Sequence, residues 1–427
     1  MAHPVAATAL KPLLDELVGG DLRVRFEFWD GSALGPTDGT GTVVVRSPDA
    51  LQRILWAPGE LGFARAYVAG DLDPEGDLFE ILRALQAAMP KRRPSPRAFA
   101  AAALAARQLG LLQRPPPPPP GEARPKGRRH SRARDGRVVS HHYDVSNDFY
   151  RLVLGPSMTY SCARFVSDDM TLEAAQASKH ELTSRKLGLH LRPEMRLLDV
   201  GCGWGSMAIH AASHHGATVV GVTISQAQAD LARKRVVEAG VGDRVDIRVQ
   251  DYRDVADGPF DAISSIGMFE HVGAERVAEY ATSLRALLAP AGRLLNHAIS
   301  SVGGSRIGRR SFIGRYIFPD AQLVDVGETV LALETAGFEV RDVESLREHY
   351  AKTLRAWIEN LEDHWDEAVD LVGEPRARTW RLYMAGSVVG FDDGGTSVHQ
   401  VLGVVPSSSR GSGMPPTRDD WQVGEPS

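Results

Sequence analysis

Three glycines at alternate positions, following an apolar run, are the strongest chemical signal in this chain. The run covers residues 195–200 and is typical of a buried parallel strand, and apolar periodicity at 207–212 predicts a helix just beyond it. Between them stand Gly201, Gly203 and Gly205. Glycine permits positive φ and lets a ligand approach the main chain, and a helix N-terminus favours an electron-rich group. The pattern predicts a cofactor site, although dinucleotide enzymes use a similar turn and a turn of this kind can also serve only to pack a βα unit.

The residues after the next predicted strands decide between cofactors. A nicotinamide-binding unit would place Asp or Glu at the end of the second strand, 217–222, to hold the ribose hydroxyls. That strand end carries Thr223 instead, with Gln228 a turn later. Two later strands also lead into segments with polar residues, 250–253 and 266–273. Polar groups at three strand ends fit a nucleoside joined to an amino acid better than a pyrophosphate, so we expect S-adenosylmethionine.

Five motifs in a fixed order extend this signal along the chain. They are His142–Tyr150 (HYDVSNDFY), Met158–Ala163 (MTYSCA), the glycine turn, Met268–Gly273 (MFEHVG) and Tyr350–Trp357 (YAKTLRAW). The series resembles the cyclopropane-fatty-acyl-phospholipid synthases and their mycolic-acid and methyl-branching relatives, over residues 140–400 and more loosely before them. The resemblance implies an α/β protein with a Rossmann-like, seven-stranded class I methyltransferase sheet and a small α+β N-terminal domain.

The same resemblance implies a catalytic set. In this family the base is a bicarbonate ion held by a cysteine, a glutamate, a histidine and a tyrosine. The matching residues, with the backbone of Ile299 completing the hydrogen bonds of the anion, are Cys162, Glu270, His297, Ile299 and Tyr350. Histidine and tyrosine can donate to a carbonate oxygen, and a glutamate can accept the proton and pass it on. A carboxylate beside an anion in an apolar pocket should have a raised pKa.

Each of these residues also has a purely structural interpretation. A lone cysteine is usually a small buried apolar residue, and His297 after a strand could be a hydrogen-bonded core histidine. Covalent catalysis by Cys162 is not expected, because no acyl-transfer constellation accompanies it. The pairs His141–His142 and His214–His215 lack the Cys/His spacing of a metal site, so we expect no metal.

Nine residues are expected to bind S-adenosylmethionine, by their positions in the matching motifs. They are Tyr160 and Ser161 at the methionine end, Gly201, Gly203 and Gly205 along the sulfonium and carboxylate, Thr223 and Gln228 at the ribose, and Asp251 and Tyr252 beside the adenine. Trp204 within the glycine turn could instead pack against the helix.

Length and composition indicate a two-domain intracellular protein. The 427 residues exceed the usual size of one domain. Its two cysteines, Cys162 and Cys202, fit a reducing compartment without disulfides. The N-terminus lacks a basic region followed by an apolar core, and no stretch reaches the roughly 18 to 20 uncharged apolar residues that span a bilayer. We expect a cytoplasmic protein that meets the inner face of the membrane only peripherally.

Charge is distributed unevenly. Residues 91–134 hold twelve Lys or Arg and one acidic residue, Glu122, a balance of +11, so the rest of the chain sums to −16 against a net of −5. Such a segment can bind anionic lipid headgroups or act as a solvated linker. Nucleic acid is not the expected partner, because Phe99 is the only aromatic residue there to stack on bases.

Composition divides the chain into four parts. They are a small lipid-handling N-terminal domain at 1–112, a Pro-rich basic linker at 113–139, an S-adenosylmethionine-dependent methyltransferase domain at 140–405 and a disordered tail at 406–427. Alternating strands and helices in the third part predict a mainly parallel sheet. Its later strands are expected at 245–249, 260–265, 292–298, 338–343 and 398–404. An aromatic and basic insertion at 300–328 could cover an acyl chain.

The expected reaction transfers a methyl group to the double bond of an unsaturated phospholipid acyl chain, through a carbocation, and gives a cyclopropane fatty acid. Such a cation needs a dry apolar slot and a base. Another route from the same cation gives a methylene fatty acid, which a partner reductase would convert to a methyl branch. The resemblance implies that the N-terminal domain serves lipid capture and dimer contact. A homodimer is therefore one expected assembly. The alternatives from other classes are an inactive lipid-binding homologue and a methyltransferase acting on oxygen or nitrogen.

Overall fold

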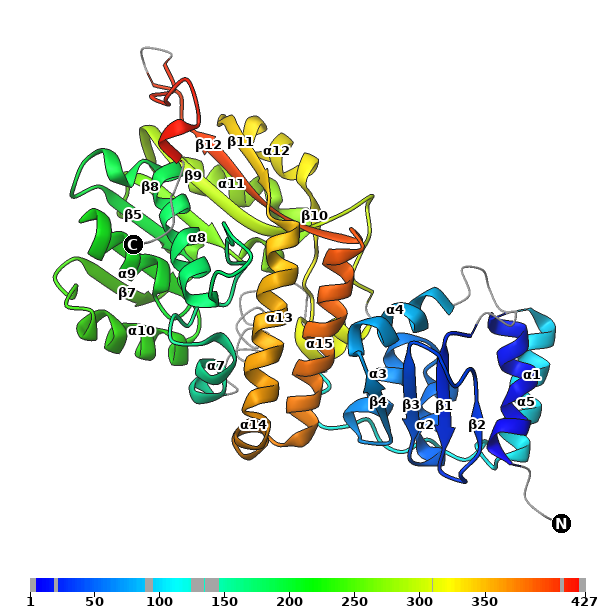
Figure 1. The fold of residues 1–427 in the computed structure, drawn as a ribbon. Coiled ribbons are helices and arrows are strands. Elements are labelled where there is room, and N and C mark those ends of the chain that lie inside the picture. Colours follow the sequence, from blue (N-terminus) through cyan, green and yellow to red (C-terminus); the bar gives the residue numbers. More distant parts are fainter. Residues whose placement is uncertain are drawn as a thin grey trace. The chain divides into compact units, whose positions relative to one another are not determined.

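The structure, a computed structural model, describes residues 5–18, 22–88, 95–123, 134, 146–308, 310–407 and 411–421. The chain forms two compact units (Figure 1). Unit 1 comprises residues 1–123, 310–317 and 373–389, and unit 2 comprises residues 124–309, 318–372 and 390–427. The first boundary falls inside the expected linker, of which residues 124–133 and 135–139 lie outside the described part. Unit 1 differs from the expected N-terminal domain because it also takes two segments from later in the chain.

Unit 2 is built on a twisted sheet with the strand order β11-β12-β9-β8-β5-β6-β7. The strands are β5 (Arg196–Val200), β6 (Thr218–Thr223), β7 (Val245–Val249), β8 (Phe260–Ile266), β9 (Leu288–Ser301), β11 (Glu339–Ser345) and β12 (Thr396–Val404), and the short β10 (Val324–Asp325) pairs with β9. Neighbours from β7 to β9 are parallel, whereas β12 runs antiparallel to both β9 and β11. This arrangement confirms the expected class I methyltransferase fold, with its reversed final strand.

Helices cover both faces of this sheet. They are α7 (Asn147–Leu154), α8 (Leu172–Leu187), α9 (Ser206–His215), α10 (Gln226–Glu238), α11 (Val277–Ala286), α12 (Val326–Thr335), α13 (Arg347–Asp363) and α14 (Trp365–Val372). Successive side chains of a strand point to opposite faces. Leu197 of β5 therefore packs with α8, α9 and α10, while Leu198 packs with α11 and α12. No helix in the described part of the chain is long and apolar enough to cross a membrane.

Part of the C-terminal tail packs against the helices of unit 2, to which it belongs. Trp421 is buried in the cluster formed by α8, α9 and α10, and Arg418 Nε donates to Asp342 Oδ1 at 2.7 Å. The expectation of a wholly disordered tail is therefore wrong for residues 411–421, since an aromatic anchor and an ion pair hold them. Residues 408–410 and 422–427 lie outside the described part.

Unit 1 contains a four-stranded sheet in the order β2-β1-β3-β4. Its elements are α1 (Ala6–Val18), β1 (Val24–Phe28), β2 (Ala33–Leu34), β3 (Gly41–Val45), α2 (Pro48–Trp56), α3 (Glu60–Val68), β4 (Leu72–Gly76), α4 (Leu78–Ala88) and α5 (Pro96–Gln108). The polar composition of β4 (LDPEG) carries no strand signal, and its pairing with β3 is what makes it a strand.

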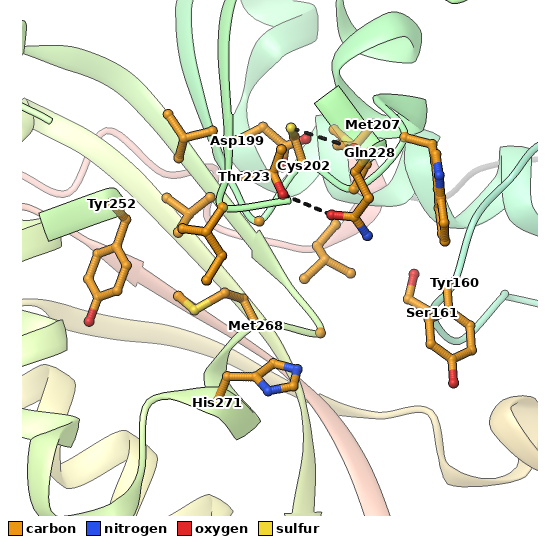
Figure 2. Close-up of a pocket in the computed structure, with 18 of the residues that line it drawn as sticks. Tyr160, Ser161, Asp199, Cys202, Met207, Thr223, Gln228, Tyr252, Met268 and His271 are labelled. Atoms are coloured by element: carbon orange, nitrogen blue, oxygen red, sulfur yellow. Dashed lines mark hydrogen bonds between the residues drawn. The ribbon is translucent and has the colours of Figure 1, made fainter. Parts of the chain in front are cut away.

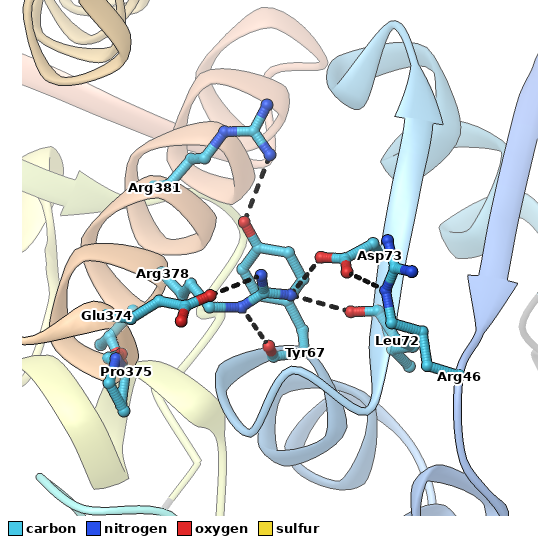
Figure 3. Close-up of polar contacts among 9 residues, drawn as sticks. Arg46, Tyr67, Leu72, Asp73, Glu374, Pro375, Arg378 and Arg381 are labelled. Carbon is cyan, nitrogen blue, oxygen red and sulfur yellow. Dashed lines mark hydrogen bonds and ion pairs between the residues drawn. The ribbon is translucent and has the colours of Figure 1, made fainter. Parts of the chain in front are cut away.

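The helix α15 (Glu374–Asp392) supplies the main polar anchor within unit 1 (Figure 3). The guanidinium of Arg378 is buried over the ring of Tyr67, 4.3 Å from its centroid. It donates to the Tyr67 carbonyl at 2.6 Å, to the Leu72 carbonyl at 2.9 Å, and forms an ion pair with Asp73. These bonds satisfy two carbonyls at the α3–β4 turn, so a residue from the C-terminal third of the sequence completes the N-terminal unit.

Candidate functional site

A cavity opens in unit 2 where β5, β6, β7 and β8 end (Figure 2). This is the switch point of the sheet, where β6 and β8 flank β5 on opposite sides, and ligands of open α/β sheets bind there. Eight of the nine predicted cofactor residues line the cavity: Tyr160, Ser161, Gly201, Gly203, Thr223, Gln228, Asp251 and Tyr252. The ninth, Gly205, does not line it and instead precedes α9 as its N-cap.

The glycine turn leaves its backbone open toward this cavity. Gly201, Gly203 and Gly205 have φ angles of 76°, 55° and 83°, a region that L side chains rarely adopt. A Cβ atom on Gly201 would stand 3.0 Å from Cβ and Cγ of Met268, which also lines the cavity. The first glycine is therefore required both for its backbone angle and for the space in front of it.

Gly201→Ala should weaken S-adenosylmethionine binding by about tenfold or more, because positive φ alone costs roughly 1–2 kcal/mol in a non-glycine residue. Isothermal titration calorimetry on the purified variant would measure this. Gly240→Ala is a matched control, because Gly240 has φ 69° but open space around it and does not line the cavity. Equal cofactor affinity in the two variants would contradict the assignment.

The residues predicted for the ribose and the adenine already interact with one another or with neighbours. Thr223 Oγ1 donates to Gln228 Oε1 at 2.8 Å, and both side chains are buried (Figure 2). Arg253 holds both oxygens of Asp251 through Nε and Nη2, at 2.8 and 2.5 Å. Burial raises the pKa of Tyr252 to about 12, so its phenol is neutral. The pairing of Asp251 with Arg253 was not anticipated, although the two residues are only two positions apart in the same segment.

At the methionine end, Tyr160 lies between two other aromatic rings. Its centroid is 5.8 Å from that of Tyr150 and 5.3 Å from that of Trp357. Figure 2 shows Tyr160 and Ser161 across the cavity from Tyr252. Trp204 is almost fully buried at the cavity wall and donates through Nε1 to Asn147 Oδ1 at 2.9 Å. Trp204, whose role the sequence left open, therefore both packs against its neighbours and lines the cavity.

Several lining residues were missed by sequence reasoning. They include Lys179 and His180 from α8, Asp199 from β5, and Met268 and His271 from the segment after β8. The last two lie in a motif that was recognised, so their presence there was the available signal. No sequence pattern distinguished the α8 residues, because that helix buries polar and apolar side chains alike.

The cavity fits S-adenosylmethionine. Asp199 Oδ1 accepts from Ser264 at 2.7 Å, but Oδ2 is buried and has no partner among the described residues. Burial raises the pKa of Asp199 to about 6, and its ionised form would be stabilised by a positively charged group. Buried polar atoms without partners call for a ligand, and the open glycine turn gives that ligand access to the backbone.

The predicted catalytic residues lie beside this cavity rather than in its wall. The thiol of Cys162 contacts the Leu346 carbonyl at 3.6 Å, and the same carbonyl accepts the backbone N–H of Tyr350 at 3.0 Å. Leu346 N donates to the carbonyl of Val398, which pairs with Ile299 across β12 and β9. The thiol contact of Cys162 and these backbone bonds therefore link the Cys162 segment, the start of α13 and the β12–β9 pair.

Glu270 and His297 are buried and keep one polar atom each without a partner among the described residues. Glu270 Oε1 accepts the Ile299 N–H at 2.7 Å, while Oε2 has no partner. Burial raises the pKa of Glu270 to about 7 and lowers that of His297 to about 3. Gln400 Nε2 contacts His297 Nδ1 at 3.3 Å, which leaves Nε2 as the protonated, unpartnered nitrogen. The expected role of Ile299 changes in one respect, because its amide proton is committed to Glu270.

The other two members of the set are Cys162 and Tyr350. Burial raises the pKa of the Cys162 thiol far above its usual value, so this cysteine is a hydrogen-bond donor rather than a nucleophile. Tyr350 packs its ring on Phe391, with centroids 4.7 Å apart, and edge-on to Trp357 at 6.1 Å. The surroundings of the set are therefore apolar and aromatic.

A separate cluster of potential metal ligands joins α8 and α9. The ligand atoms of Glu181, His210 and His215 lie within 4.8 Å of one another. Glu181 Oε2 contacts His215 at 2.9 Å and His210 at 3.3 Å, while Arg185 donates to Oε1 at 2.6 Å. These partners, His210 first, lower the pKa of Glu181, and they explain the geometry by hydrogen bonding alone. His141 and His142 lie outside the described residues.

Comparison with known proteins agrees with the fold and the cavity. A sequence model of the family described as mycolic acid cyclopropane synthetase matches residues 130–401. The chain belongs to this family. It is an S-adenosylmethionine-dependent methyltransferase.

Proteins named as fatty acid methyltransferases and a protein named as a cyclopropane synthase are similar to this methyltransferase. A probable fatty acid methyltransferase of Mycobacterium tuberculosis is 43% identical, over 94% of this chain and 96% of its own length. The tuberculostearic acid methyltransferase UfaA1 of the same organism is 33% identical, over 92% and 91%. The crystal structure of the mycolic acid cyclopropane synthase CmaA1, complexed with SAH and CTAB, is 35% identical with a TM-score of 0.59, over 63% of this chain and 98% of its own. The first two matches thus include most of unit 1.

Proposed function

We propose that this enzyme methylates the double bond of an unsaturated phospholipid acyl chain and gives a cyclopropane fatty acid. The observation that carries the proposal is the position of Glu270. Met268 and His271 line the cavity, and Glu270 between them has a buried side chain with a pKa of about 7 and one oxygen without a partner among the described residues. A proton acceptor of this pKa beside the methyl donor suits a reaction that must lose a proton from carbon.

The residues of the chain have separable tasks in this reaction. S-adenosylmethionine supplies the electrophilic methyl group. The aromatic side chains of Tyr160, Tyr350 and Trp357 exclude water, which would otherwise capture a carbocation. Glu270 is the final protein acceptor of the proton that leaves the substrate.

A bicarbonate ion as an intermediate proton carrier is supported by the unpartnered polar atoms of Glu270 and His297. His297 Nε2 is a buried donor without a partner among the described residues, and the neutral Cys162 thiol would be a second donor once its one hydrogen turns away from the backbone carbonyl of Leu346. Tyr350 would provide a third through its phenol. Bicarbonate would supply a base at this place, and Glu270 Oε2, which has no partner, would then receive its proton.

A second product is favoured by one comparison. The similarity to the tuberculostearic acid methyltransferase extends over more than nine-tenths of this chain, including unit 1. A methylene fatty acid, reduced to a methyl branch by a partner reductase, is therefore the alternative outcome of the same methylation step.

A membrane surface as the place of action is supported by α5 and the turn after it. The large apolar side chains Phe99, Leu104 and Leu112 are 64%, 55% and 58% exposed, while the small Ala98, Ala105 and Ala106 are buried. Arg97 and Arg107 are exposed on the same helix. Apolar side chains next to arginines suit insertion at an anionic interface.

The product is tested by gas chromatography–mass spectrometry of fatty acids from cells that express the enzyme and contain oleate phospholipids. A new fatty acid heavier by one CH2, absent with the Glu270→Gln variant, is expected. Derivatisation separates a ring from a methylene group. Methyl transfer to saturated phospholipid at the same rate would overturn the proposal, because it would show an oxygen or nitrogen acceptor.

A further inference from the structure

Two buried lysines on α8 differ in how their charges are balanced. Lys179 and Lys186 are 0% and 1% exposed and stand two helical turns apart on the same face. Lys186 forms ion pairs with Asp342, at 2.8 Å, and with Glu344. Lys179 forms no ion pair with any described residue within 4 Å, and its only hydrogen bond is to Ser161 Oγ at 3.0 Å. A fully buried ammonium with one hydroxyl partner is costly, since buried charges are normally paired.

The surroundings of Lys179 do not supply the missing anion. The carboxyl group of Asp199 is near enough to raise the pKa of Lys179 by its charge. However, Asp199 Oδ1 accepts a hydrogen bond from Ser264, and Asp199 forms no ion pair with Lys179. Burial lowers the pKa of Lys179 to about 7, and the proximity of Cys162 and Asp199 opposes this shift only in part. Lys179 and Ser161 both line the cofactor cavity, so an anion bound there can reach the ammonium.

We propose that Lys179 Nζ, together with Ser161 Oγ, binds the carboxylate of the methionine moiety of S-adenosylmethionine. The carboxylate is the only anionic group of that cofactor, and Ser161 lies at the end of the cavity expected to hold its methionine part. Binding would pair the ammonium and satisfy the hydroxyl at the same time. The inference rests on the identity of the cofactor and is independent of which acyl chain or product the enzyme uses.

Isothermal titration calorimetry of Lys179→Met with two ligands tests the contact. One is S-adenosylmethionine, and the other is its decarboxylated form, S-adenosyl-3-methylthiopropylamine, which lacks only the carboxylate. The variant should bind S-adenosylmethionine about 30-fold or more weakly than wild type, the effect of truncating one side of a buried charge pair. It should bind the decarboxylated ligand as wild type does, because no carboxylate contact is lost. Neither measurement requires lipid or turnover.

Three outcomes overturn the proposal. Equal weakening for both ligands would show that Lys179 only supports the fold. No weakening for either would show that it does not meet the cofactor. Loss of bicarbonate-dependent turnover with unchanged affinity for both ligands would place its charge opposite a different anion.

Two further variants make the test robust. Lys186→Met removes the other buried charge and should lower the melting temperature without changing the ratio of the two affinities. Lys179→Gln keeps a hydrogen-bond donor toward Ser161 but no charge. If Lys179→Met fails to fold, Lys179→Gln should show the same selective loss of affinity for S-adenosylmethionine relative to the decarboxylated ligand. A Lys179→Gln variant with wild-type discrimination between the ligands would contradict the contact.

Discussion

Glu270→Gln should lower turnover by about 10²- to 10⁴-fold, the range that a positioned general base contributes. The amide is close to isosteric and its oxygen can still accept the Ile299 N–H, which Glu270 Oε1 does at 2.7 Å. It cannot take up a proton. Glu270 does not line the cofactor cavity, so the affinity for S-adenosylmethionine should stay near that of wild type. Radiolabelled methyl transfer to oleate phospholipid and calorimetry of cofactor binding measure the two quantities.

The wild-type enzyme should show a matching pH dependence. Burial raises the pKa of Glu270 to about 7, and only the ionised carboxylate accepts a proton. Turnover should therefore rise as the pH increases through about 7 and then level off, and Glu270→Gln should lose this rise. Glu275→Gln, an exposed glutamate five residues later, is the control and should behave as wild type. Near-wild-type turnover of Glu270→Gln would rule out the proton-acceptor role.

Arg378→Ala should destabilise unit 1 by about 3–5 kcal/mol, the cost of breaking a buried ion pair from one side. The substitution would leave the carbonyls of Tyr67 and Leu72 without their donor and Asp73 without its buried cation. It would also remove the stacking of the guanidinium on the Tyr67 ring. Differential scanning calorimetry should show an earlier transition for unit 1.

Arg376→Ala is the matched control for this experiment. Arg376 lies on the same helix two residues earlier and is only half-buried, and its side chain forms no hydrogen bond or ion pair with the described residues. Its replacement should leave the melting profile unchanged. If Arg378→Ala melts as wild type does, the guanidinium does not hold the α3–β4 turn and α15 must be anchored to unit 1 by apolar packing alone.

The sequence by itself determined the catalytic fold and predicted a set of cofactor residues that the structure gathers around one cavity. Parallel strands buried on both faces read as apolar runs, so β5 to β9 could be found within a few residues of their bounds, apart from the early start of β9. The glycine turn can be recognised in the sequence because residues other than glycine rarely adopt the positive φ of Gly201. Eight of the nine residues that the motifs predict for the cofactor lie in the cavity wall.

Only the tertiary structure decided which charges are balanced and which segments complete each unit. Lys179 and Lys186 are the same residue type on the same helix face, and only the strands opposite show that one is paired and the other is not. Likewise, nothing near Arg378 in the sequence indicates that its partners are Tyr67 and Asp73, about three hundred positions away. Local patterns record periodicity and backbone angles, whereas ion pairing and burial depend on residues that only folding brings together.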